Sequence, residues 1–149
     1  MNMEKHYGPL NEEFLLCIEQ FWQFGLPKDY KIFLLKFNGG VPKKTAFNFK
    51  GKQEGSVLDS FYGIVRGNDN ILLVAKDIGH RYPSTMLPIA DDVFGNRILL
   101  SVKGPDRGKV YFWDHEMEAG EGEEPSYDNL TLIADSFDEF INSLHDMKE

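Results

Sequence analysis

The chain has 149 residues, of which 42% are hydrophobic, and it carries 24 acidic against 16 basic side chains, for a formal charge of −8. This is the length of one domain, and the aromatic content of 13% is enough for a packed core, so the composition excludes a disordered chain. No apolar run approaches the roughly 18 residues of a membrane span, no targeting segment opens the chain, and a single cysteine, Cys17, fits a reducing cytoplasm.

The first part of the chain predicts two short helices joined by a tight connection. Residues 11–24 repeat apolar side chains at the helical period after Asn11, a suitable N-cap, and Gly25 is expected to end this helix. The period restarts after Pro27 and stops at Asn38-Gly39-Gly40, which permits the left-handed conformation that ends a helix. The stripes expected to be buried are Phe14, Cys17, Ile18 and Phe21 in the first helix and Tyr30, Phe33, Leu34 and Phe37 in the second.

The middle of the chain changes to the pattern of strands. Residues 45–49 and 57–65, separated by a glycine-containing turn, predict a β-hairpin. A third helix follows, with Asn68 as its cap, Gly79 at its end, and an apolar stripe at Ile71, Val74, Ala75 and Ile78.

Four more strands and a helix complete the chain. Residues 86–90, 97–102 and 109–114 predict an antiparallel meander, and residues 130–133 predict one further strand. A Ser-x-x-Glu capping box then opens a helix with its apolar stripe at Phe137, Phe140, Ile141 and Leu144. We therefore predict an α+β fold in a single domain over residues 1–149, with a mostly antiparallel twisted sheet of about five or six strands covered by about four helices.

The sequence lacks a complete template for catalysis or metal binding. The segment from Asp114 to Ala119 begins like a zinc-protease helix, but Ala119 stands where the second histidine is needed. Asp91 and Asp92 begin a segment that resembles a calcium loop without its terminal glutamate, so a turn is the better interpretation, with a weak cation site left open. Cys17 lies on a stripe expected to be buried and is interpreted as a small core residue. The residues predict a binding module, not an enzyme, with no cofactor and no metal.

The acidic side chains are concentrated in the last quarter of the chain. Residues 1–112 hold 15 basic and 12 acidic side chains, whereas residues 113–149 hold 12 acidic side chains and one basic. This charge disfavours nucleic acid and anionic membranes as partners and favours a basic protein, although a solvated surface that only aids solubility is the alternative. The candidate partner-binding residues are Asp91, Asp92, Asp114, Glu116, Glu118, Glu121, Glu123, Glu124 and Asp128.

Five motifs in a fixed order resemble those of one known family. They occupy residues 26–35, the Asn38-Gly39-Gly40 element, residues 87–96, residues 108–116 with the sequence GKVYFWDHE, and residues 133–141. In this order they resemble the SUKH superfamily, the Smi/Knr-like group that contains bacterial immunity proteins and the yeast cell-wall assembly regulator. Within these motifs, Pro88 is expected at the edge or start of a strand. Phe112 and Trp113 alternate across a strand, so one can pack inward while the other is available to a partner or a covering helix.

The resemblance implies a function as well as a fold. The leading hypothesis is a cytoplasmic immunity protein that binds and neutralises a cognate polymorphic toxin, such as a nuclease, whose basic surface would meet the acidic segment. The alternative is a non-enzymatic regulatory or scaffold module of the cell-wall regulator type. The sequence leaves the oligomeric state and the identity of the toxin open.

Overall fold

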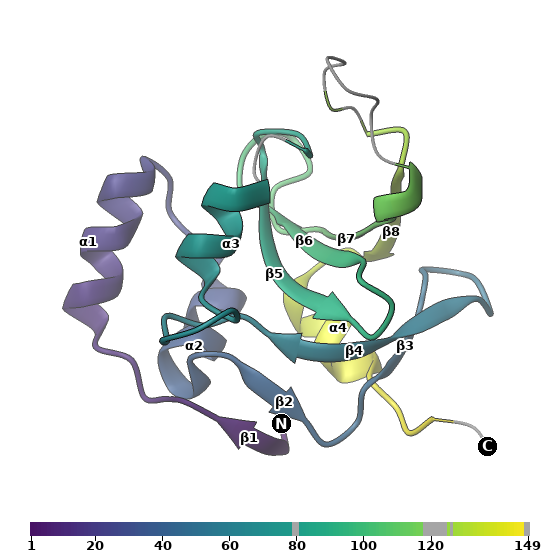
Figure 1. Cartoon of the computed structure of the whole chain (residues 1–149), viewed down its shortest axis with the longest axis horizontal. Coiled ribbons are helices and arrows are strands. Elements are labelled where there is room, and N and C mark those ends of the chain that lie inside the picture. Colours follow the sequence, from purple (N-terminus) through teal and green to yellow (C-terminus); the bar gives the residue numbers. More distant parts are fainter. Residues whose placement is uncertain (79–80, 118–124, 126, 148–149) are drawn as a thin grey trace.

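The computed structural model of the chain describes residues 1–78, 81–117, 125 and 127–147 (Figure 1). In this part of the chain none of the helices is both long and apolar enough to cross a membrane. The helices are α1 (Glu12–Trp22), α2 (Lys28–Phe37), α3 (Ile71–Ile78), α4 (Phe137–Ser143) and the short 3-10 helix η1 (His115–Met117). The strands are β1 (Met3–His6), β2 (Gly40–Pro42), β3 (Ala46–Asn48), β4 (Gly55–Phe61), β5 (Met86–Asp92), β6 (Arg97–Ser101), β7 (Val110–Trp113) and β8 (Leu130–Ala134).

The strands form an open antiparallel sheet in the order β1-β2-β4-β5-β6-β7-β8, with β3 paired to β4 beside this path. The α+β class, the β3–β4 hairpin, the meander of β5, β6 and β7 and the further strand β8 are therefore confirmed. The prediction of five or six strands was wrong, because the described residues form eight. Neither β1 nor β2 had been predicted. Both strands are short, and neither has an alternating apolar pattern. Gly40 permits their pairing, since a Cβ at this position would lie 2.1 Å from the carbonyl oxygen of Lys5.

An aromatic core fills the space between the sheet and the pair α2 and α4. The ring centroids of Phe33 on α2 lie 4.8 Å from Phe61 on β4 and 5.0 Å from Phe137 on α4. Phe140 adds a further edge-on contact to Phe47. The stripes predicted for α2 and α4 do face the core, so these two helices are fixed to one face of the sheet.

Helix α3 packs against β5, and its Ile71, Leu72, Val74 and Ala75 join the same core as α2 and α4 (Figure 1). On the opposite face of the sheet, a second apolar cluster joins Trp113 to Tyr82, Met86 and Leu99. Phe112 and Trp113 do point to opposite faces, but both are buried, at 8% and 1% exposure. Neither ring is therefore available to a partner.

The first helix buries Ile18 as predicted, but the other residues of the predicted stripe face solvent. Leu15, Ile18 and Glu19 are buried, whereas Phe14 and Phe21 are 47% and 83% exposed and Cys17 is exposed as well. The prediction that Cys17 is a core residue was wrong. The reason is Glu19, whose Oε2 accepts from Leu26 N and whose Oε1 accepts from Lys31 Nζ, each at 2.7 Å.

Several helix ends also differ from the expected residues. Asn11 caps α1 as predicted, by accepting from Phe14 N, but Gln23 instead of Gly25 takes the left-handed conformation at its end. Asn70, not Asn68, caps α3 by accepting from Leu72 N, and Gly79 lies outside the described residues.

Two further local predictions were right only in part. The Ser136 half of the predicted capping box forms, with Ser136 Oγ accepting from Glu139 N, whereas the Glu139 side chain pairs with Lys50. Pro88 lies in the central strand β5 and not at an edge, and the register shifts between Pro88 and Ala90. Such an irregularity is one place where a sheet tolerates proline.

Candidate partner-binding site

Three chain segments meet at one end of the meander: the β5–β6 turn, the end of β7 with η1, and the turn before β8. His115 N donates to Asn96 Oδ1 at 3.2 Å, which joins the first two segments. Asn129 Nδ2 donates to the carbonyl oxygen of Asp114 at 3.3 Å, which joins the second to the third. The segments that carry Asp91, Asp92, Asp114, Glu116 and Asp128 are thereby brought to one end of the sheet, as the candidate surface required.

Asp92 is part of the turn itself. It is 4% exposed, and its carboxylate accepts from Ser56 Oγ at 2.7 Å, Phe94 N at 3.0 Å, Asn96 N at 2.8 Å and Asn96 Nδ2 at 3.0 Å. All four bonds lie within the chain and fix the β5–β6 turn to β4. Asp92 therefore positions the acidic end of the sheet and offers little of its own surface to a partner.

Asp91 is the partly buried acid of this end. Its Oδ1 accepts from Ser60 N at 3.3 Å, across the β4–β5 pairing. Burial raises the pKa of the Asp91 carboxyl, and the neighbouring Asp59 carboxylate raises it further, while Arg97 acts in the opposite direction. The sheet thus holds a carboxylate where burial and a like charge disfavour the ionised form.

Two acids near Asp91 had not been predicted as part of the site. The Asp59 and Asp69 carboxylates both act on the pKa of Asp91, and Asp69 also raises the pKa of the Tyr62 hydroxyl, for which burial is the main cause. Both acids come from the segment of β4 and the loop after it, far from the acidic quarter in sequence. Only the pairing of Ser60 with Asp91 could have indicated that they lie together, and that register contains a shift.

The remaining described acids lie at the end of β7. Asp114 Oδ1 accepts from Glu116 N at 2.9 Å and so caps η1. The Glu116 and Asp128 side chains are exposed. The predicted residues Glu118, Glu121, Glu123 and Glu124 belong to the acidic quarter of the sequence and lie outside the described residues.

An exposed aromatic ring accompanies these acids. Phe94, at the tip of the β5–β6 turn, is 69% exposed, and the carboxylate of Asp92 holds its backbone N–H. Arg97 follows this turn at the start of β6, and its Nη1 donates to the carbonyl oxygen of Gly95 at 2.8 Å. The site therefore combines a fixed turn, a projecting ring and several carboxylates. This combination suits an anchored contact with a basic protein surface.

The metal-ligating side chains of the described residues do not form a cluster. Among residues 1–78, 81–117, 125 and 127–147, no group of three or more His, Cys, Asp and Glu side chains is placed to hold a metal ion. His115 donates its backbone N–H to Asn96 and stands in the 3-10 helix η1, not in a zinc-protease helix.

Comparison with known proteins gives two matches. The sequence model of the SMI1 / KNR4 family (SUKH-1) matches residues 9–143. The chain is also 33% identical over 138 residues to the SPbeta prophage-derived uncharacterized protein YokK of Bacillus subtilis (strain 168). That alignment covers 81% of this chain and 67% of the relative.

Proposed function

This chain belongs to the SMI1 / KNR4 family (SUKH-1), and we propose that it is an immunity protein that binds and neutralises a cognate toxin in the bacterial cytoplasm. The family indicates the class of function, because the superfamily that the chain resembles contains immunity proteins and regulators of the same fold. The relative is named for its prophage origin and is given no activity in that name, so it supports the family and not the partner.

The observation that carries the proposal is the acidic end of the meander. Asp91, Asp114, Glu116 and Asp128 come from three segments joined by hydrogen bonds, and Asp59 and Asp69 extend the negative charge across β4. A toxin that acts on nucleic acid must present lysine and arginine to phosphate groups. Carboxylates on a rigid sheet end can contact the same side chains and block access to the substrate.

Phe94 supplies the apolar part of this contact. Interfaces obtain most of their affinity from a few buried aromatic or arginine side chains surrounded by polar groups. Phe94 is an exposed ring on a turn that four hydrogen bonds to the Asp92 carboxylate hold in place. Its insertion into a pocket of the toxin would cost little conformational entropy, because the turn is already ordered.

The test begins with the genes that neighbour the one for this chain. Any toxin domain encoded there is co-expressed with this chain, and binding kinetics are then measured on the purified pair. We expect rescue of growth and a direct complex. Reversal of Glu116 together with Glu118, Glu121 and Glu123 to Lys should slow association by roughly tenfold at low ionic strength, and the difference should shrink in high salt. Phe94→Ala should act mainly on the dissociation rate.

A matched control separates this surface from total charge. Glu4 is exposed on β1, at the far edge of the sheet from β7 and β8, so Glu4→Lys and Glu116→Lys change the charge by the same amount, and only Glu116→Lys should slow association. An acid-reversed variant that associates as fast as the unmodified chain would remove the acidic end from the mechanism. Absence of both rescue and binding would instead reject the immunity role and favour the regulatory scaffold.

A further inference from the structure

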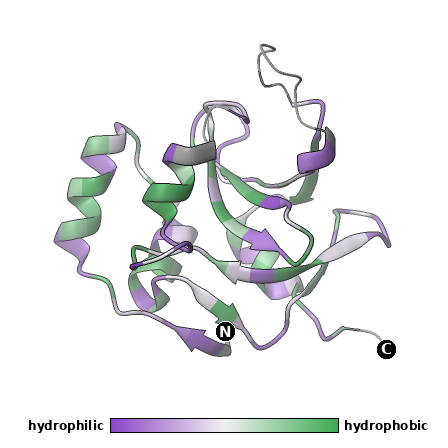
Figure 2. Ribbon diagram, in the orientation of Figure 1, coloured by the Kyte–Doolittle hydropathy of each residue, from purple (hydrophilic) through white to green (hydrophobic). Residues whose placement is uncertain are grey.

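The first helix carries an apolar stripe that its own chain leaves uncovered. Phe14, Cys17 and Phe21 are spaced three and four residues apart and lie on one side of α1, and all three are exposed. Phe21 is the most exposed of the chain's described large apolar side chains, at 83%. This spacing is typical of a helix that packs along a second helix. Figure 2 shows the apolar segments of α1 at the edge of the molecule.

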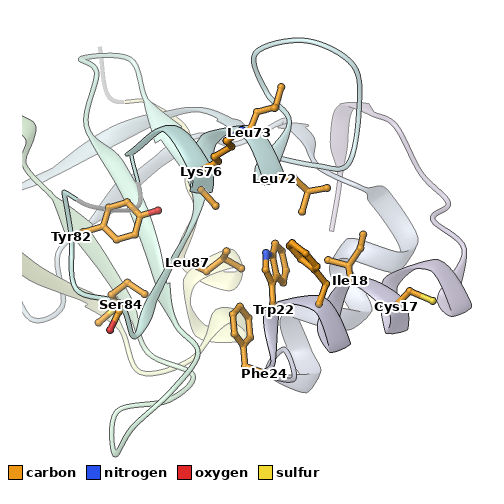
Figure 3. Close-up of a pocket in the computed structure, with 13 residues that line it drawn as sticks. Cys17, Ile18, Trp22, Phe24, Leu72, Leu73, Lys76, Tyr82, Ser84 and Leu87 are labelled. Carbon is orange, nitrogen blue, oxygen red and sulfur yellow. The ribbon is translucent and has the colours of Figure 1, made fainter.

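An apolar groove continues from this stripe. It has a volume of about 800 Å³ and lies between α1, α3 and the start of β5. The rings of Trp22 and Phe24 stack along one part of it, with centroids 5.2 Å apart and planes at 9°, and Leu72 and Leu73 of α3 line another (Figure 3). Cys17 stands at the α1 end of the lining, so the stripe and the groove form one surface.

The two ends of α1 carry opposite charges. Glu12 and Glu13 occupy its first turn and are exposed. Beyond its last turn, Lys103 Nζ lies 5.5 Å from the centroid of the Phe24 ring, and Arg107 Nη2 donates to the carbonyl oxygen of Gly25 at 2.8 Å. The surface is therefore acidic where α1 begins and basic just beyond the residues where it ends.

We propose that this surface binds a second copy of the chain, with the two α1 helices antiparallel across a twofold axis. Cys17 is the central residue of α1, so it would lie at the axis beside Cys17 of the second copy. Phe14 would then face Phe21 of the second copy, and Glu13 would face Lys103 of the second copy. A twofold axis makes each such contact twice, so one surface that is acidic at one end and basic at the other satisfies both halves. This inference is independent of the proposed toxin.

Oligomeric state gives the first test. One three-turn helix with its groove is at the small end of specific interfaces, so we expect a dimer with a Kd on the order of micromolar. Light scattering and sedimentation over a micromolar concentration series should show the mass rising from one chain to two. Phe21→Asp should weaken the dimer by roughly tenfold or more without loss of folding, because the side chain is exposed. Phe94→Asp, an equally large change at another exposed ring, should leave the dimer unchanged.

Crosslinking tests the position of the axis. A short bis-maleimide should join two copies through Cys17, which is the single cysteine of the chain, and Cys17→Ser should abolish the product. A variant with Cys17→Ser and Gln53→Cys carries an exposed thiol at the distant β3–β4 turn and should give no dimeric product. A dimer that forms without crosslinking at Cys17 would refute the antiparallel arrangement.

Charge exchange tests the direction of the helices. Glu13→Lys or Lys103→Glu alone should raise the Kd roughly two- to fivefold, the range of exposed ion pairs, and the two changes together should restore it. If the chain remains monomeric throughout the concentration series, the proposal is wrong and the groove is left for a different partner.

Discussion

Replacing Asp92 by Ala removes the acceptor of four hydrogen bonds at the β5–β6 turn. Two of the donors are the backbone N–H groups of Phe94 and Asn96, and Asp92 itself is 4% exposed. A single hydrogen bond to a charged group contributes about 1.5–3 kcal/mol, and the contributions of bonds that share one acceptor group do not simply add. We therefore expect the free energy of unfolding to fall by about 3–4 kcal/mol.

Asp92→Asn changes the same hydrogen bonds less severely than Asp92→Ala. The amide keeps one oxygen for the two backbone N–H groups, but its nitrogen meets the Nδ2 group of Asn96, which is also a donor. The expected loss is about 1–2 kcal/mol, roughly half that of Asp92→Ala. Asp92→Asn should therefore leave a folded chain whose turn can still be tested for partner binding.

Urea unfolding followed by tryptophan fluorescence measures both variants, with Glu54→Ala as the exposed control. A lower midpoint at an unchanged slope is the expected signature of lost stability. Suppose that Asp92→Ala loses less than about 1 kcal/mol and yet no longer binds the toxin. Asp92 would then be a contact residue, and the assignment of its carboxylate to the turn would be refuted.

Three further changes test other parts of the structure. Glu19→Ala should lower the free energy of unfolding by about 3 kcal/mol in urea, because Lys31 and the N–H of Leu26 lose their partner, whereas the exposed Glu12→Ala should not. Asn38→Ala should lower the free energy of unfolding by about 2–3 kcal/mol in the same assay, because the Asn38 amide both donates to and accepts from the backbone of Ile64. Asn38 also has a φ of 50°, so Asn38→Gly should recover only the part of this loss that comes from the backbone conformation. Asp91→Asn should stabilise the chain near neutral pH: with its pKa raised in the fold, Asp91 binds its proton more tightly when folded, so stability is lost as pH rises above the ordinary value of 3.8. Thermal unfolding measured from acid to neutral pH should show a flatter profile for Asp91→Asn, and a profile parallel to that of the unmodified chain would contradict this.

The elements with a strong local pattern were predictable. The stripe of α2 and the stop at Asn38 depend on neighbouring residues alone, and both are present. The meander of β5, β6 and β7 was also predictable, because turn-forming residues separate apolar strands that pair in chain order. Strands β1 and β2 gave no such signal. They are held by backbone pairing across Gly40, which depends on the absence of a side chain and not on an apolar pattern.

The error in α1 has a physical cause that the local pattern does not contain. Two apolar faces were available, one around Leu15 and Ile18 and one around Phe14 and Phe21. Buried acids are rare, so the presence of Glu19 predicts that its face of α1 is exposed. The ion pair with Lys31 of α2 reverses this preference, and that contact joins residues on two different helices. Prediction of the candidate site was incomplete for the same kind of reason. The sequence did not indicate that Asp59 lies near Asp91, because the β4–β5 pairing that brings them together includes a register shift.

The two proposed surfaces lie on different sides of the molecule, and this makes a joint prediction. In Figure 1, α1 is at one end of the longest axis, while the ends of β5 and β7 lie toward the other. A dimer through α1 would therefore leave both acidic ends open, and native mass spectrometry should find two chains with two toxin molecules. Phe21→Asp should reduce this to one of each with unchanged toxin affinity. If Phe21→Asp instead weakened toxin binding, α1 would belong to the toxin interface, and the separation of the two surfaces would be wrong.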